Sequence, residues 1–237
     1  MMPRSIIFVR HAQSVGNTMT QDQRAVHEIP NHAFPLTELG KMQATITGKY
    51  IKRRFFDWSV PLRERPVLFF ESTFLRTQMT REIILYNMGI AKESVICRRD
   101  SRLDEKWDGI FHELSMSDIE RFYPEQLRLR ARSGYYHYRA PGGESCPDAE
   151  LRIRSFLSDP MVANQHIVIV GHGRWAILLH KILFGLTVEE FLKLKTEGLK
   201  DGGTENCSVI EYSTNPLSYK CVVPWKGQLP EQETEPA

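Results

Sequence analysis

Three short apolar runs constrain the fold of this chain more than any other feature. Each run ends in polar residues and is followed by a helix-like pattern. They occupy residues 5–9, 67–70 and 166–170. Runs of this length that are rich in β-branched and aromatic residues are typical of buried strands. Because helical patterns separate them, the sequence predicts an α/β fold: a three-layer sandwich with a mostly parallel sheet, helices on both faces and an inserted lid.

Apolar residues at helical spacing predict the helices that cover this sheet. Two stripes are expected to face the core. They comprise Leu39, Met42, Ile46 and Tyr50 after the candidate N-cap Thr37, and then Leu75, Met79 and Ile83. Later elements are helices over residues 148–157 and 175–184, with Gly185 as a stop, a helix after a capping box of Thr187 and Glu190, and strands over 207–212 and 219–223.

One segment, residues 107–146, does not follow this alternation and is rich in aromatic side chains. We expect it to form the lid over the strand ends, where specificity usually resides. With 237 residues, of which 41% are hydrophobic, the chain can bury one sizeable core. We therefore predict a single domain over residues 1–227 and a disordered tail over 228–237.

Charge and cysteine content narrow the range of partners. The net charge of +2, from 31 basic and 29 acidic side chains, predicts no nucleic-acid binding. No apolar stretch reaches the roughly 18 residues that cross a bilayer, so no membrane segment is expected. The four cysteines lack CxxC spacing and no secretory leader precedes them, which favours a cytoplasmic protein with reduced thiols. Cys146 is expected to be a packed thiol rather than a reactive one.

The residues after the first strand suit a phosphate site. The segment RHAQSVGN, residues 10–17, begins at the carboxyl end of that strand, where open α/β sheets bind their ligands. Arg10 matches phosphate oxygens with a rigid fork of donors, and His11 can be nucleophilic at neutral pH. Ser14 and Asn17 add neutral donors. This segment therefore predicts an attack on phosphate.

Two further strand ends carry compatible groups. His172 and Gly173 follow the run 166–170, and Arg76 lies in the first turn of the helix after the run 67–70. Helix N-termini favour anions. We expect the three ends to meet, with His172 acting as a charged donor. Arg81 and Arg174 are expected to form salt bridges on helix faces. The other histidines are expected to be structural or exposed, with His137 in the lid of most interest.

At this point the chain resembles the histidine phosphatase superfamily, in its phosphoglycerate-mutase-like branch. The matching segments, in family order, are RHAQSVGN, LTELGKMQA (36–44), ESTFLRTQMT (71–80), LDEKWDG (103–109), GGES (142–145) and GHG (171–173), with NCSV (206–209) resembling the closing strand. One departure is Ala12, where the family has glycine. Its methyl group is tolerable if the backbone keeps a negative φ.

The resemblance implies a role for each matching residue. His11 would form a phosphohistidine, and Glu105 would protonate the leaving oxygen, with Asp104 as a nearby alternative. No cofactor is implied. Metal binding is disfavoured because no HxH or HExxH pair occurs and the arginines would repel a cation. Phosphate contacts are expected from Arg10, Ser14, Asn17, Arg76, His172 and Gly173, and substrate contacts from Tyr138 and Arg139.

Three functions remain open at this stage. The first is a metal-independent phosphatase that hydrolyses small phosphorylated substrates. The second is a phosphoglycerate mutase that uses a bisphosphorylated primer; the chain lacks the mutases' paired-arginine segment, and its acidic ending is a poor cover for an anionic site. The third is an inactive module that recognises phosphate, which would not need the acid Glu105. The sequence does not identify the physiological substrate, and it is compatible with a homodimer.

Overall fold

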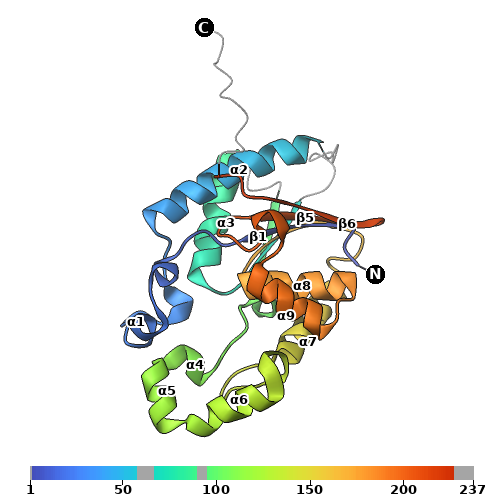
Figure 1. Ribbon diagram of the computed structural model, residues 1–237. Coiled ribbons are helices and arrows are strands. Elements are labelled where there is room, and N and C mark those ends of the chain that lie inside the picture. Colours follow the sequence, from blue (N-terminus) through green and yellow to red (C-terminus); the bar gives the residue numbers. More distant parts are fainter. Residues whose placement is uncertain (1, 58–66, 90–94, 227–237) are drawn as a thin grey trace.

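A six-stranded mixed sheet forms the centre of the molecule (Figure 1). The computed structural model describes residues 2–57, 67–89 and 95–226. The strand order is β3-β2-β4-β1-β5-β6. Strands β3, β2, β4 and β1 run parallel to one another. Strand β5 pairs antiparallel with β1, and β6 pairs antiparallel with β5. The strands are β1 (Ser5–Arg10), β2 (Val67–Glu71), β3 (Val95–Arg99), β4 (His166–Gly171), β5 (Val209–Thr214) and β6 (Leu217–Val222).

Helices cover both faces of this sheet, which confirms the predicted three-layer α/β fold (Figure 1). On one face Ile7 and Val9 pack with Ile51 and Ile84 from α2 (Glu38–Asp57) and α3 (Leu75–Met88). On the other, Ile6 and Phe8 pack with side chains of α7 and α8. The helices of that face are α7 (Cys146–Leu157), α8 (Gly173–Phe184) and α9 (Val188–Glu197). The alternation of side chains along β1 therefore builds two cores.

The predicted core stripe of α2 is wrong at its first turns, because Leu39 and Met42 are exposed. The buried face lies one position further on and consists mostly of small or polar residues. A Cβ atom on Gly40 would overlap the backbone of Gln13, and one on Gly48 would lie 2.8 Å from the carbonyl oxygen of Ile84. Because α2 approaches its neighbours so closely, small residues rather than large apolar ones face inward.

The other predicted elements occur, with shifted ends. Ser145 and Asp148 form a capping box, so α7 begins before residue 148. Gly185, with a φ of 64°, ends α8, and Thr187 with Glu190 caps α9 as predicted. Strand β3 was not predicted, since it is short and lies at the edge of the sheet with side chains that are mostly exposed. The predicted tail, residues 228–237, lies outside the described residues.

A helical insert fills residues 107–146 and lies below the sheet layers in Figure 1. Its two ends meet: the backbone N–H of Glu144 donates to the carbonyl oxygen of Trp107 at 2.8 Å. Gly109, with a φ of 53°, allows this approach, because a Cβ atom there would overlap the carbonyl of Pro141. The insert contains α4 (Ile110–Glu113), α5 (Met116–Phe122) and α6 (Pro124–His137).

Short helices complete the chain. They are η1 (Val15–Thr18), α1 (Gln21–Ala25), η2 (Asn31–Ala33), η4 (Ser101–Leu103) and η5 (Lys200–Gly202). Within the described ranges, no helix combines the length and apolar character that crossing a membrane requires.

Candidate active site

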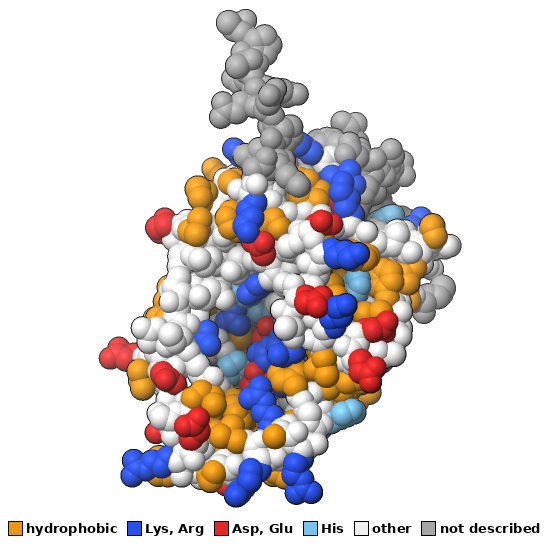
Figure 2. Space-filling model, viewed as in Figure 1, with side chains coloured by type: hydrophobic (Ala, Val, Ile, Leu, Met, Phe, Trp, Pro, Cys, Tyr) orange, Lys and Arg blue, Asp and Glu red, His pale blue; other side chains and the backbone are white. Residues whose placement is uncertain are grey.

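The histidines and arginines predicted to bind phosphate gather where three parallel strands end. Arg10 pairs in register with Gly171 across β1 and β4, so His11 and His172 leave the sheet side by side. Their rings lie edge to face, with centroids 5.2 Å apart. Arg76, from the first turn of α3, lies 3.4 Å through its NH2 group from Nδ1 of His172. Figure 2 shows basic and histidine side chains gathered around a hollow in the middle of the face of the molecule that it presents.

His11 is held as a neutral imidazole with one nitrogen available. Its ring is buried, and Nδ1 lies 2.8 Å from the carbonyl oxygen of Ala12. A carbonyl can only accept, so Nδ1 carries the proton and Nε2 keeps its lone pair. Burial, together with the charges of Arg76 and Arg10, holds the pKa of His11 well below its usual value. The ring therefore remains nucleophilic at and below neutral pH.

Asn206 and Thr80 fix the loop that carries this histidine. The Nδ2 group of Asn206 donates to the carbonyl oxygen of His11 at 2.9 Å, and the N–H of Ala12 donates to Oγ1 of Thr80 at 3.0 Å. The methyl group of Ala12 packs with Leu36 among buried residues on the side of α2. The described non-glycine residues with positive φ do not include Ala12, so the condition for tolerating alanine at this position is met.

His172 departs from the predicted charged state. Its ring is fully buried, and Nε2 lies 2.7 Å from the hydroxyl of Ser72. Burial, followed by the charge of Arg76 and by the neighbouring His11 and Arg10, lowers the pKa of His172 well below its usual value. The imidazole is therefore neutral in this environment. A phosphate dianion beside the ring would oppose these effects and raise the pKa.

Two buried guanidinium groups supply the positive charge. Arg76 donates through NH1 to the carbonyl oxygen of Asn31 at 2.8 Å and stacks on Phe74. Burial lowers the pKa of Arg76 to about 10, which still leaves it charged at neutral pH. Arg10 donates to the carbonyl oxygen of Thr204, while its Nε is the one buried side-chain N or O atom without a partner among the described residues. A buried donor of this kind indicates an anion site.

Ser14 and Asn17 are bonded mainly to each other. The backbone N–H and the hydroxyl of Ser14 donate to Oδ1 of Asn17 at 2.9 and 3.1 Å. Asn206 adds a bond to the same oxygen at 3.3 Å. The Oδ1 atom is thus occupied, and the amide Nδ2 of Asn17 is the group that could donate to an anion. A Cβ atom on Gly173 would lie 3.3 Å from Nε of Arg10, so this glycine makes room for that arginine.

The two candidate acids have different surroundings. Glu105 accepts from the backbone N–H of Lys106 at 3.0 Å, and its negative charge opposes the lowering of the pKa of Arg10 and Arg76. Asp104 instead accepts from the backbone and hydroxyl of Thr73 at 2.7 and 2.9 Å. Burial raises the pKa of Asp104, and both of its oxygens accept from Thr73. The charge of Glu105 acts on both Arg10 and Arg76, and it acts on Arg76 more strongly than that of Asp104 does, which favours Glu105 as the proton donor.

Arg174 forms salt bridges, as predicted, but with carboxylates that lie outside its own helix. From the first turn of α8 its guanidinium reaches Asp108 in the insert and lies 3.7 Å from Oε1 of Glu105. Although burial lowers its pKa, these two carboxylates outweigh that effect and raise it. Arg174 therefore joins the acid to the insert. Arg81 forms its predicted salt bridge, but with Glu71 of β2 at 2.8 Å.

The predicted substrate residues separate in space. Tyr138 lines a pocket of about 100 Å³ whose walls come mostly from the insert, which we call the pocket beneath the insert. The Tyr138 hydroxyl donates to Oε1 of Gln126 at 2.9 Å. Arg139 is exposed, pairs with Asp148 and is not among the residues that line this pocket. His137 is also exposed. Of the lid residues predicted to touch substrate, only Tyr138 therefore faces this pocket.

Two further site contacts had no sequence signal: Asn31 and Thr204 reach the key arginines only through the tertiary fold. Ser72 lies within the segment ESTFLRTQMT and Asn206 within the closing NCSV segment, so both could have been found there. Over the described ranges, no group of three His, Cys, Asp or Glu side chains is arranged to hold a metal ion. Cys146 is a packed thiol as predicted, and burial raises its pKa to about 11.

Known proteins resemble this chain in sequence and in fold. The phosphoglycerate mutase-like protein AT74H of Arabidopsis thaliana is 32% identical over 84% of this chain and 72% of its own length. A 2,3-bisphosphoglycerate-dependent phosphoglycerate mutase of Methylobacterium radiotolerans is 27% identical over 78% of this chain and 82% of its own. The fold matches a mycobacterial glucosyl-3-phosphoglycerate phosphatase with a TM-score of 0.62 and 23% identity, covering 92% of this chain and 97% of that one.

The family model for the histidine phosphatase superfamily (branch 1) matches residues 6–220. This range includes every motif that carried the resemblance in the sequence. The chain belongs to branch 1 of the histidine phosphatase superfamily.

Proposed function

We propose that this protein hydrolyses phosphomonoesters through a phosphohistidine on His11, without a metal ion. The observation that carries the proposal is the state of His11: a buried, neutral ring whose Nε2 is available, beside the guanidinium groups of Arg10 and Arg76. Phosphoryl transfer depends on positioning and on positive charge around the phosphate oxygens. The site supplies both from its own side chains.

The reaction has two displacements. First, Nε2 of His11 attacks phosphorus in line, an N–P bond forms and the P–O bond to the leaving group breaks. Glu105 gives its proton to the leaving oxygen. Next, the Glu105 carboxylate takes a proton from water, whose oxygen attacks phosphorus. The N–P bond breaks, and inorganic phosphate and free His11 result. Arg10, Arg76 and His172 stabilise the phosphate oxygens in both steps.

A phosphoglycerate mutase is the second candidate, because curated relatives at 27–28% identity carry that name. A mutase must return the phosphoryl group to an organic acceptor, whereas a phosphatase gives it to water.

The four free cysteines support the further proposal that the protein works in the cytoplasm.

The experiment measures both outcomes on the purified protein. Release of inorganic phosphate is followed over a panel of phosphorylated metabolites and an aryl phosphate, with and without a chelator. Interconversion of phosphoglycerates is followed with a bisphosphate primer. We expect steady phosphate release that survives the chelator and competitive inhibition by vanadate. Primer-dependent interconversion faster than hydrolysis would favour the mutase, and activity restored only by a divalent ion would contradict the metal-free mechanism.

A further inference from the structure

A second group of cations lies between the insert and α8, centred on the ring of Tyr135. The side-chain ends of Lys106, Arg130 and Lys195 lie 5.7, 5.6 and 4.1 Å from the ring centroid. The NH1 group of Arg174 lies 3.5 Å from the tyrosine oxygen. These cations come from four separate parts of the chain, and none of them is needed to surround a phosphate on His11.

Two of these four cations are paired with carboxylates within the described residues, and Arg130 is one of the two that are not. Lys106 and Arg174 share the carboxylate of Asp108, and Arg174 also pairs with Glu105. Within the described part of the chain, Arg130 has no acidic side chain within ion-pair distance. It is held instead over the ring of Phe111 at 4.9 Å and beside Tyr135. Aromatic faces fix its position and leave its N–H groups available.

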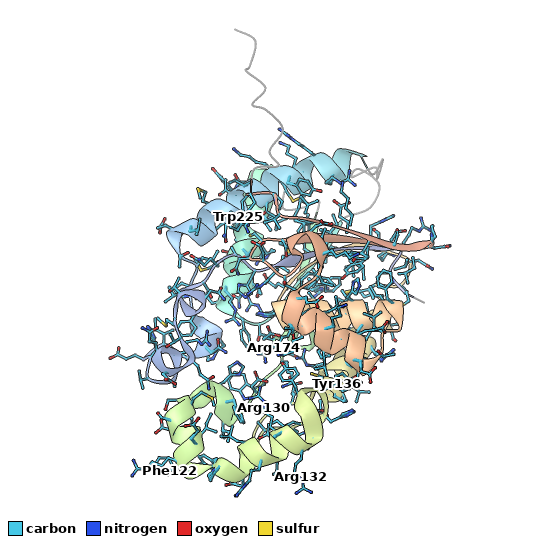
Figure 3. The ribbon with its side chains drawn as sticks, in the orientation of Figure 1. Phe122, Arg130, Arg132, Tyr136, Arg174 and Trp225 are labelled. Carbon is cyan, nitrogen blue, oxygen red and sulfur yellow. The ribbon has the colours of Figure 1, made fainter. Side chains whose placement is uncertain are left out.

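Arg130 lines the pocket beneath the insert together with Lys106, Asp108, Tyr135 and Tyr138. This pocket adjoins the proposed acid, because Asp108 contacts Arg174 and Arg174 contacts Glu105. Figure 3 shows Arg130 on α6 and Arg174 at the start of α8 in the space between the insert and the rest of the domain, whereas Arg132 points away from that space. The pocket is therefore placed to hold the part of a substrate beyond its leaving oxygen.

We infer that this pocket binds a second negatively charged group of the substrate, a carboxylate or another phosphate, and that Arg130 is the residue that selects it. The inference rests on the proposed phosphatase function and specifies its substrate class. A planar guanidinium matches the oxygens of either group with paired hydrogen bonds. Arg132, two residues further along the same helix and exposed, has the same chemistry without the pocket.

The test compares Arg130→Met with the matched control Arg132→Met. Two substrate pairs isolate the second charge: 3-phosphoglycerate against glycerol 3-phosphate for a carboxylate, and fructose 1,6-bisphosphate against fructose 6-phosphate for a phosphate. We expect Arg130→Met to lower kcat/KM about tenfold or more for the doubly charged member of at least one pair, mainly through KM. Glycerol 3-phosphate, fructose 6-phosphate and p-nitrophenyl phosphate should change little, and Arg132→Met should resemble the wild type.

Binding separates this inference from the proposed function. Calorimetry on His11→Ala, alone and combined with each methionine variant, measures affinity for the same pairs without turnover. A wild type that hydrolyses none of the compounds contradicts the phosphatase proposal, while a selective affinity loss with Arg130→Met still supports the pocket. Equal losses for singly and doubly charged ligands, or equal effects of the two variants, would overturn the inference.

Discussion

The Nδ1 atom of His11 lies 2.8 Å from the carbonyl oxygen of Ala12, the next residue in the chain. This contact fixes the tautomer of the ring, because a carbonyl oxygen needs a donor. It also fixes the direction of attack, since only Nε2 then has a lone pair to offer. The chemistry of the site thus depends on a backbone atom that any residue at position 12 would supply.

His11→Ala should lose about three orders of magnitude or more in turnover while remaining folded, because it removes the phosphoryl acceptor. Rapid quenching of the wild type with labelled substrate should trap an acid-labile adduct, which NMR should identify as phosphorylated on Nε2. The control is His137→Ala, which changes an exposed histidine of the insert. Label on a serine or cysteine, or on Nδ1, would contradict the assignment.

Glu105→Gln should slow turnover most for substrates with poor leaving groups. An alkyl phosphate needs a proton on its leaving oxygen, whereas p-nitrophenolate leaves without one. We expect the loss for an alkyl phosphate to exceed that for p-nitrophenyl phosphate by about tenfold or more. Plotting rate against leaving-group basicity for both proteins measures the difference.

Asp104→Asn provides the control for this experiment. Its carboxylate accepts from Thr73, so we expect a lower unfolding temperature and no change in leaving-group dependence. If Asp104→Asn shows the selective loss and Glu105→Gln loses activity equally for both substrates, Asp104 is the acid.

The parts of the site that were predictable from the sequence lie in local patterns. Arg10, His11 and His172 each follow directly on an apolar strand, and neighbouring parallel strands deliver their ends to one edge of the sheet. The surroundings of these residues were not predictable in the same way. Whether His172 is charged depends on burial and on Arg76, which approaches it from a strand and helix elsewhere in the chain.

The difference between local sequence patterns and contacts made by the tertiary fold also explains the predictions that the structure corrects. Periodicity located α2 correctly but chose large side chains for its inner face, whereas the closeness of its neighbours selects Gly40 and Gly48. Arg174 was expected to form a salt bridge on a helix face, and it does, but its partners come from the loop before the insert and from the insert itself. Such contacts depend on the path of the chain between elements, which short-range patterns do not encode.

Ala12→Gly should leave activity nearly unchanged and lower stability. The alanine methyl group packs away from His11, and the variant keeps the carbonyl that fixes the tautomer. Loss of a buried methyl group and the greater freedom of glycine in the unfolded chain together cost about 1–2 kcal/mol. Urea unfolding measures the free-energy change, and steady-state kinetics measures the activity. A large change in kcat would show that the methyl group shapes the pocket.

Stability should fall as the pH drops below the ordinary range of histidine. Burial lowers the pKa of His180 to about 4, whereas an unfolded histidine titrates near 6.5. Above about pH 6.5 neither state binds the proton; between about 6.5 and 4 only the unfolded chain does, so the folded state loses stability. His11 and His172 act in the same direction.

The measurement is the free energy of unfolding at intervals between pH 8 and about 4.5. His180→Gln should be less stable at neutral pH, yet its stability should decline less steeply, by up to about 1.4 kcal/mol per pH unit. Parallel curves for the two proteins would mean that His180 takes up its proton equally in the folded and unfolded states.

The last prediction concerns Tyr138 and Arg139, which lie shortly before the GGES motif. Tyr138 is buried, lines the pocket and anchors Gln126 of α6, so Tyr138→Phe should raise KM for substrates that fill the pocket and leave the chemical step almost unchanged. Arg139→Gln should have little effect on kinetics, because its side chain is exposed and pairs with Asp148. Kinetics on p-nitrophenyl phosphate and on a larger substrate separate the two effects. If Arg139→Gln raises KM as much as Tyr138→Phe, then Arg139 swings into the site when substrate binds, and the pocket extends further than its present lining.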